Sequence, residues 1–219
     1  MKPQLLKLIP WIIFLGFGVL IVLRVDINGV GSIIWFINAI LISVIRAPFE
    51  KTNKANVVTE KRAVSAEKAL LFGVFFGGSL LPVLHLGFGL FAFANYSLPL
   101  WSIAIALILL VGGLFLFYRS HADLGRNWSV TTEIREDHTL VTEGVYQRIR
   151  HPMYSAIWLF FIAQPLLVQN WIAGLSGIVA FGLMYFARIR YEEQMMHDQF
   201  GADYKAYVAR TGRVFPKFG

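Results

Sequence analysis

Apolar residues in this chain gather into long runs that are separated by polar stretches holding most of the charge. A run of about 20 apolar residues is long enough to cross the hydrocarbon core of a bilayer as a helix. Four runs of about this length stand in the first half of the chain, at about residues 8–23, 27–45, 69–94 and 100–118. Each predicts one membrane-spanning helix.

A fifth apolar run, residues 152–187, is too long for a single span. Four residues interrupt it, namely Gln164, Pro165, Gln169 and Asn170. The pattern therefore predicts two short helices in a hairpin, which brings the total to about six transmembrane segments. Beyond residue 187 the sequence turns polar, and we expect the last helix to continue out of the membrane, to stop at Gly201 and to be followed by a short helix over 202–210.

The composition agrees with an all-α, polytopic helical membrane protein. Hydrophobic residues make up 57% of the 219 and charged residues 15%, whereas soluble domains carry about 25% charged residues. The net charge is +7, but all basic residues except Arg24 lie in the first seven residues, in 46–68, in 119–151 or beyond 187. The positive-inside rule explains this bias and places both termini in the cytoplasm, so no nucleic-acid partner is expected.

Two features concern the beginning of the chain. Lys2 and Lys7 before an apolar run resemble a signal peptide, but no small-residue cleavage site is evident, so a retained first span is expected. We predict two parts, residues 1–68 as an N-terminal transmembrane hairpin with its cytoplasmic connection, and residues 69–219 as the core with a C-terminal binding region.

The polar loop that ends at Arg150-His151-Pro152 is the first candidate for chemistry. Proline has no N–H and a fixed φ, so Pro152 reads as the first residue of a helix and His151 as its cap. The N–H groups of a helix start favour an anion. Tyr146 and Tyr154 can stack on a flat ring or cover a cation, although aromatic residues at a membrane interface are the more common case.

The second candidate lies where the last apolar run ends. Arg188 precedes Glu192 by four residues and so shares its helical face. One interpretation is a surface ion pair; the other is a ligand site in which Glu192 holds a cation and Arg188 an anion. The histidines show no close-spaced pair and cysteine is absent, so no metal is expected. No glycine-rich nucleotide motif is present either.

Five short motifs together resemble the isoprenylcysteine carboxyl methyltransferase (ICMT) family in its prokaryotic branch. In order they are Gly125-x-Asn-Trp-Ser129, His138-x-Leu-Val-x-x-Gly-x-Tyr146, Arg150-His-Pro-x-Tyr154, Glu192-Glu193 and Phe200-Gly-x-x-Tyr204-x-x-Tyr207. The resemblance covers about residues 70–216, and the first span looks like an addition to the family core. It implies an integral membrane protein of the prokaryotic inner membrane.

The resemblance also implies S-adenosyl-L-methionine as methyl donor, held by the 119–151 loop and the C-terminal tail. Carried over by position, the cofactor contacts are Thr131, His138, Thr139, Leu140, Val141, Tyr146, His151, Pro152, Met153, Tyr154 and Glu192. Arg188 falls where the eukaryotic enzymes orient the substrate carboxylate, and Glu193 is a second candidate catalytic residue.

The acceptor implied by the resemblance is a lipophilic or lipidated carboxylate, reached through the membrane. An ionised carboxylate needs no general base, so alignment and exclusion of water suffice. Two other enzyme functions remain open: methylation of a lipid amine or small thiol, which needs a base, and an NADPH-dependent membrane reductase related to the sterol reductases. A membrane scaffold or lipid-binding protein that kept the fold is a non-enzymatic alternative.

Overall fold

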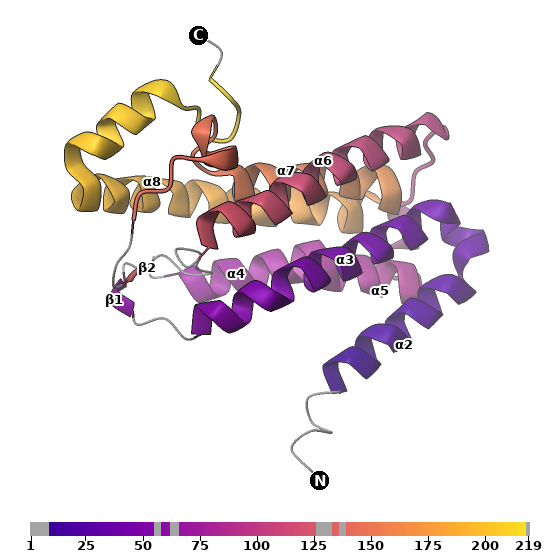
Figure 1. Ribbon diagram of the computed structural model, residues 1–219. Coiled ribbons are helices and arrows are strands. Elements are labelled where there is room, and N and C mark those ends of the chain that lie inside the picture. The colour runs from indigo at the N-terminus through magenta and orange to yellow at the C-terminus, as the bar shows by residue number, and fades with distance from the viewer. Residues whose placement is uncertain (1–8, 55–57, 62–65, 126–132, 136–138, 218–219) are drawn as a thin grey trace.

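The computed structural model describes residues 9–54, 58–61, 66–125, 133–135 and 139–217. Helices dominate this part of the chain and lie side by side in a bundle (Figure 1). Its main helices are α2 (Ile9–Leu23), α3 (Val25–Lys54), α4 (Glu67–Phe75), α5 (Leu81–Phe88), α6 (Trp101–Leu124), α7 (Pro152–Val168) and α8 (Trp171–Arg210). Short helical turns are η1 (Phe76–Leu80), η2 (Ala92–Ala94) and η4 (Gly144–Gln147).

Four of these helical segments are long and apolar enough to cross a membrane: residues 29–50, 67–88, 101–124 and α8. Helix α7 is apolar but shorter. The chain is therefore an integral membrane protein with a helical bundle, as the apolar runs predict. The bundle core includes buried aromatic and aliphatic side chains of α6 and α7, where the rings of Phe117 and Phe160 meet edge to face at 5.8 Å.

Helix α3 joins this core closely. Gly31 lies so near the backbone of Leu167 in α7 that an added Cβ would fall 2.4 Å from the Leu167 carbonyl oxygen. The N-terminal hairpin therefore packs on the later helices through at least this contact. The division of the chain into two parts at residue 68 stays a prediction.

The third span contains a π-helical turn, η1, that the sequence pattern does not predict. The extra residue in such a turn leaves a backbone carbonyl without its usual helical donor. Here the Gly77 carbonyl accepts hydrogen bonds from Gln164 Nε2 at 3.2 Å and Ser176 Oγ at 2.6 Å. A Cβ at Gly77 would lie 2.6 Å from the Ser176 carbonyl oxygen, so glycine permits this close approach of η1 to α8.

The predicted hairpin between α7 and α8 turns at Gln169 and Asn170. Gln169 adopts a left-handed conformation with φ 48°, and the Asn170 side chain caps α8 by accepting from the N–H groups of Ile172 and Ala173. Asn170 also donates to Phe91 O and to Asn95 Oδ1. The expected hairpin is thus confirmed, with its turn at Gln169 and Asn170, whereas Gln164 and Pro165 lie inside α7 and do not interrupt it. The turn is bonded to the connection after α5.

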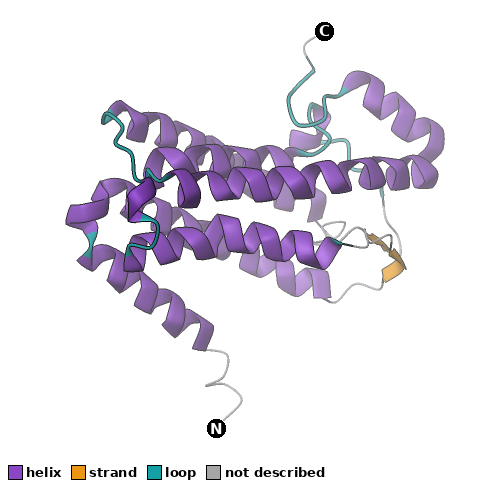
Figure 2. Cartoon of the chain, turned by 180° about the vertical axis from the view of Figure 1, so that it is seen from behind, coloured by secondary structure: helices purple, strands orange, loops and turns teal. Residues whose placement is uncertain are grey.

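Helix α8 continues beyond the apolar run and bends at Gly201, where φ is 50° and ψ is −115°. A positive φ of this kind suits glycine. Residues 202–210 then fold back over the end of the bundle (Figure 2) and bury Tyr204 and Tyr207. The predicted stop at Gly201 and the short helix after it are confirmed.

Among the described residues, two short strands, which the sequence pattern of an all-α protein does not predict, accompany the helices. β1 (Val58–Lys61) pairs antiparallel with β2 (Glu133–Arg135). In Figure 1 the pair lies at the same end of the bundle as the C-terminal part of α8. It links the two polar connections predicted to share one side of the membrane.

Candidate functional site

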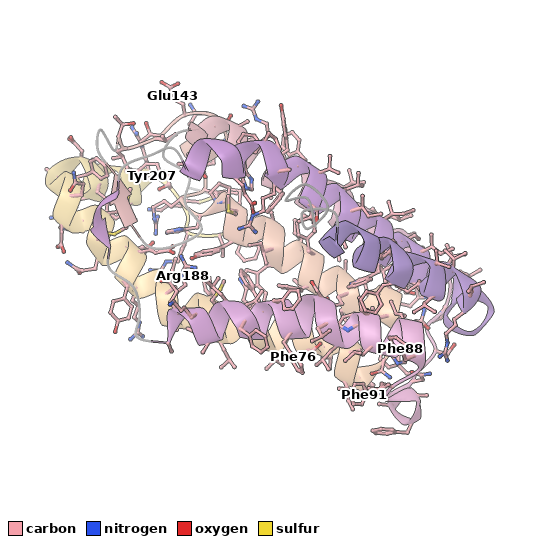
Figure 3. All side chains as sticks on the ribbon, turned by 90° about the horizontal axis from the view of Figure 1, so that it is seen from below. Phe76, Phe88, Phe91, Glu143, Arg188 and Tyr207 are labelled. Atoms are coloured by element: carbon pink, nitrogen blue, oxygen red, sulfur yellow. The ribbon has the colours of Figure 1, made fainter. Side chains whose placement is uncertain are left out.

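The polar end of the bundle gathers most of the predicted site residues. The loop before α7, the first turn of α7, the charged part of α8 and the tail after residue 210 meet here. Figure 3 shows Arg188 and Tyr207 at this end, whereas Phe88 and Phe91 mark the opposite one. The site divides into two adjoining clusters of charged side chains.

The inner cluster is centred on Arg188, whose side chain is only 6% exposed. Its Nη2 lies 2.9 Å from Glu192 Oε1 and 3.6 Å from Oε1 of Glu67, in the first turn of α4. The Tyr154 hydroxyl donates to the same Glu192 oxygen at 2.6 Å. Burial of charged groups is tolerated because they neutralise one another. Arg188, Glu192 and Tyr154 thus form one buried network, with Glu67 reaching it from another helix.

The outer cluster surrounds Glu193. Its Oε1 accepts from Arg150 Nη2 at 3.0 Å and from Arg213 Nε at 3.0 Å, and it lies 3.6 Å from His151 Nε2. Glu193 is in the charged extension of α8 beyond the apolar run. Burial alone would raise the pKa of the Glu193 carboxyl, but the neighbouring His151, Arg213 and Arg150 groups outweigh burial and lower this pKa to about 2. The carboxylate is therefore ionised at neutral pH and a weak base.

Between the clusters stands the predicted helix start. His151 is the N-cap of α7, with φ −125° and ψ 60°, and Pro152 is the first helical residue, as predicted. The His151 ring stacks on the Tyr154 ring at 5.6 Å, and its Nδ1 lies 3.8 Å from Glu192 Oε2. The cap residue thereby contacts both clusters.

The loop and the tail are joined by backbone pairing. Ile149 and Gly212 form a parallel bridge in which Arg150 N donates to Gly212 O and Gly212 N donates to Arg148 O. His151 N continues the pairing by donating to Arg213 O at 2.9 Å. Arg150 strengthens it through its Nη1, which donates to Thr211 O at 2.6 Å. Loop and tail therefore act as one connected wall.

Tyr146 fixes the loop to two other elements. Its buried hydroxyl donates to Ser120 O in α6 at 3.1 Å, and its carbonyl accepts from the Tyr207 hydroxyl at 2.6 Å. Tyr146 therefore holds the loop against α6 and the C-terminal helix, in addition to any contact with a ligand.

The structure brings most of the predicted site residues to this end. Thr139, Leu140 and Val141 lie in the loop just before η4, with Thr139 exposed and the other two partly buried. Thr131 and His138 lie outside the described residues. Glu67, Thr211 and Arg213 also belong to this site, although no local sequence pattern predicts them. Their contacts join residues far apart in the chain, and an acidic residue in a first helical turn is ordinarily explained by the helix dipole alone.

An apolar groove of about 640 Å³ opens between α8 and the helices α4 and η1. It is lined on one side by residues such as Leu70, Phe76 and Leu81, and on the other by Trp171, Leu175 and Leu183. One end reaches Ala66 and Leu183. Ala66 is the neighbour of Glu67, and Leu183 precedes Arg188 by about one and a half helical turns. On both helices the lining therefore ends within five residues, in sequence, of a member of the inner cluster.

Comparison with known proteins gives a consistent result. Residues 95–198 match the sequence model of the isoprenylcysteine carboxyl methyltransferase (ICMT) family. The chain is 31% identical over 118 residues to protein-S-isoprenylcysteine O-methyltransferase B of Arabidopsis thaliana, covering 53% of this chain and 60% of that protein. It is 28% identical over 134 residues to the protein-S-isoprenylcysteine O-methyltransferase of Saccharomyces cerevisiae, covering 58% and 56%.

A third relative has a different name. The chain is 32% identical over 99 residues to cobalt-zinc-cadmium resistance protein CzcN of Cupriavidus metallidurans, covering 45% of each protein. The chain thus spans about half the length of the curated relatives it matches. The segment matched by the family includes Arg150, Tyr154, Arg188, Glu192 and Glu193, whereas Glu67 and the tail lie outside it.

Proposed function

From the match of residues 95–198 to the isoprenylcysteine carboxyl methyltransferase family, we propose that the chain is a member of this family and a membrane methyltransferase. The proposed reaction transfers a methyl group from S-adenosylmethionine to the carboxylate of a lipidic, isoprenylcysteine-like acceptor. The observation that carries the proposal is the buried Arg188–Glu192–Tyr154 network beside the start of α7. It offers opposite charges to two reactants at the polar end of the bundle.

The residues present fit the groups of the cofactor. Glu192 is suited to the cationic ammonium or sulfonium, and the start of α7 with nearby Arg150 to the carboxylate. Leu140 and Val141 are suited to the adenine. When bound, the cofactor supplies an electrophilic methyl group. Thr131 and His138, with Thr139, Met153 and the other loop positions predicted above, are proposed as further contacts.

Arg188 is proposed to orient the acceptor. A guanidinium offers paired donors in one plane and so matches a carboxylate. The acceptor carboxylate is already ionised at neutral pH, so alignment and exclusion of water are the main requirements. The apolar groove between α4, η1 and α8 is suited to the lipid part of the acceptor, because its lining is apolar and, at Ala66 and Leu183, comes within five residues of Glu67 and Arg188 in the sequence.

Glu193 is better suited to positioning than to proton transfer. An amine or thiol acceptor needs a base, and a carboxylate whose pKa is held near 2 by two arginines and a histidine is a poor one. This favours a carboxylate acceptor over an amine or thiol. The family match favours a methyltransferase over the NADPH-dependent reductase.

The proposed orientation has the site in the cytoplasm, at the inner membrane of a prokaryotic cell. Support comes from the basic residues, nearly all of which fall in the segments assigned to one side. The cofactor then arrives from the aqueous side and the acceptor from the bilayer.

Cofactor binding tests the proposal. We expect saturable binding of S-adenosylmethionine to the detergent-purified protein in calorimetry. Glu192→Gln should weaken it roughly 10- to 100-fold, because a charge-assisted contact contributes about 1.5–3 kcal/mol. Glu143→Gln is the matched control, since Glu143 is exposed and lies apart from Arg188 in Figure 3. Folded wild-type protein that takes up no cofactor would rule the proposal out.

A further inference from the structure

Glu67 is a buried carboxylate that lies outside the segment matched by the family. Its side chain is 5% exposed, although it stands in the first turn of α4, where an acidic residue is ordinarily solvated. Favourable interaction with the helix dipole does not require burial. A buried carboxylate needs a compensating charge, and Arg188 supplies one, with its Nη2 3.6 Å from Glu67 Oε1.

The guanidinium of Arg188 is held from two directions. Glu192 lies on the same helix, one turn away, and pairs with Nη2 at 2.9 Å. Glu67 approaches that nitrogen from α4, the helix that lines the apolar groove through Ala69 and Leu70. With Glu192 alone, the guanidinium would be drawn along α8 toward the predicted cofactor side. Glu67 attracts the Arg188 guanidinium in the other direction, toward α4 and the groove.

The separation between Glu67 and Arg188 is also informative. At 3.6 Å the two groups attract each other, but the distance exceeds that of a normal hydrogen bond. A contact of this length orients the guanidinium by charge rather than by a hydrogen bond. The planar guanidinium in turn matches the carboxylate of the proposed acceptor.

We infer that Glu67 is a positioning residue for the methyl acceptor, which acts by aiming the Arg188 guanidinium at the groove between α4 and α8. The inference rests on the proposed function. The start of the third span is then part of the acceptor site. The cofactor site is separate and is built from the loop and the tail. Loss of Glu67 should therefore affect the acceptor more than the cofactor.

The test compares Glu67→Gln with wild type in steady-state methyl transfer to an S-prenylated N-acetylcysteine, together with calorimetric binding of S-adenosylmethionine. Glutamine keeps the shape and removes the charge. The acceptor KM should rise about tenfold, a change of about 1.4 kcal/mol, while the cofactor Kd stays within about twofold. Glu67→Asp keeps the charge on a shorter stem and should raise KM only about threefold. Lys68→Gln, at the exposed neighbouring position, should match wild type.

Several results would overturn the inference. An unchanged acceptor KM in Glu67→Gln would remove Glu67 from the site, and a lower KM would make it a competitor of the acceptor. An equal loss of cofactor affinity would show that Glu67 has a general structural role and not one specific to the acceptor. If Glu67→Gln does not fold, Glu67→Asp decides, and a wild-type KM in that variant contradicts the inference. If wild type turns over and the Glu67 variants keep its acceptor KM, the inference about Glu67 is refuted and the proposed function stands. If folded wild type shows no turnover, the proposed function is refuted as well.

Discussion

Replacing Arg188 with alanine is expected to lower kcat/KM for a carboxylate acceptor by about 30-fold or more, since truncating a buried charged contact costs about 2–5 kcal/mol. The cofactor Kd should change less, by under about tenfold, because Glu192 remains in place. Arg188 carries the proposed contact to the acceptor and is almost completely buried between Glu67 and Glu192. Steady-state kinetics and calorimetry on the same preparation separate the two effects.

Two further variants guard against misfolding as the explanation. Arg188→Lys keeps the charge but loses the planar fork, so it should fold and still show a raised acceptor KM. Arg190→Ala removes an exposed arginine two residues away and should leave the kinetics unchanged. An Arg188→Ala protein that turns over at the wild-type rate would exclude Arg188 from the acceptor site.

Replacing Arg150 with alanine is expected to have the largest effect on stability, about 1.5–3 kcal/mol, because it removes charged hydrogen bonds to Glu193 and to the Thr211 carbonyl, whereas Arg213 still pairs with Glu193. The Arg150 side chain is 8% exposed and joins Glu193 to the Thr211 carbonyl. Loss of the Arg150 side chain should weaken the backbone pairing between the loop before α7 and the tail after residue 210. Hydrogen exchange of the backbone amides of His151 and Gly212, which are bonded across this junction, measures the opening.

The matched control is Arg148→Ala. Arg148 is exposed, and its backbone carbonyl, which accepts from Gly212, survives the substitution. Exchange in this variant should therefore equal that of wild type. If Arg150→Ala leaves the exchange of these amides and the thermal midpoint unchanged, the outer cluster is not what holds the tail against the loop.

Local signals in the sequence foretell much of this fold. Pro152 with His151 as cap, the turn at Gln169 and Asn170, and the bend at Gly201 each depend on one residue's backbone preference or hydrogen-bonding side chain. Such preferences act over a few residues and can be predicted from the sequence without a structure. The membrane-spanning helices can likewise be predicted from the apolar runs, because the thickness of a bilayer sets the length of each run.

Pairings between distant residues could not be foreseen in the same way. Glu67 meets Arg188 only because α4 packs beside α8, and Ile149 pairs with Gly212 only because the tail folds back at Gly201. The π-helical turn η1 depends on donors from Gln164 and Ser176 on two other helices. The strands β1 and β2 are too short to show a pattern of their own. Tertiary packing decides all of these features.

The candidate site shows both kinds of feature. Glu192 and Arg188 are recognisable together because four residues bring them to one helical face. Glu193 stands beside them in sequence, but its side chain meets Arg150 and Arg213 in a different cluster. Adjacent glutamates point in directions about 100° apart on a helix, so they serve different partners. This difference supports a cofactor role for Glu192 and a positioning role for Glu193.

The most direct test of the proposed function is methyl transfer itself. Purified protein in lipid vesicles is given S-adenosylmethionine with a labelled methyl group and an S-prenylated N-acetylcysteine, and the product is treated with alkali. The account predicts a labelled product that releases volatile methanol, as a methyl ester does. A labelled product that resists alkali, or the absence of any labelled product from folded protein that binds the cofactor, would contradict carboxyl methylation.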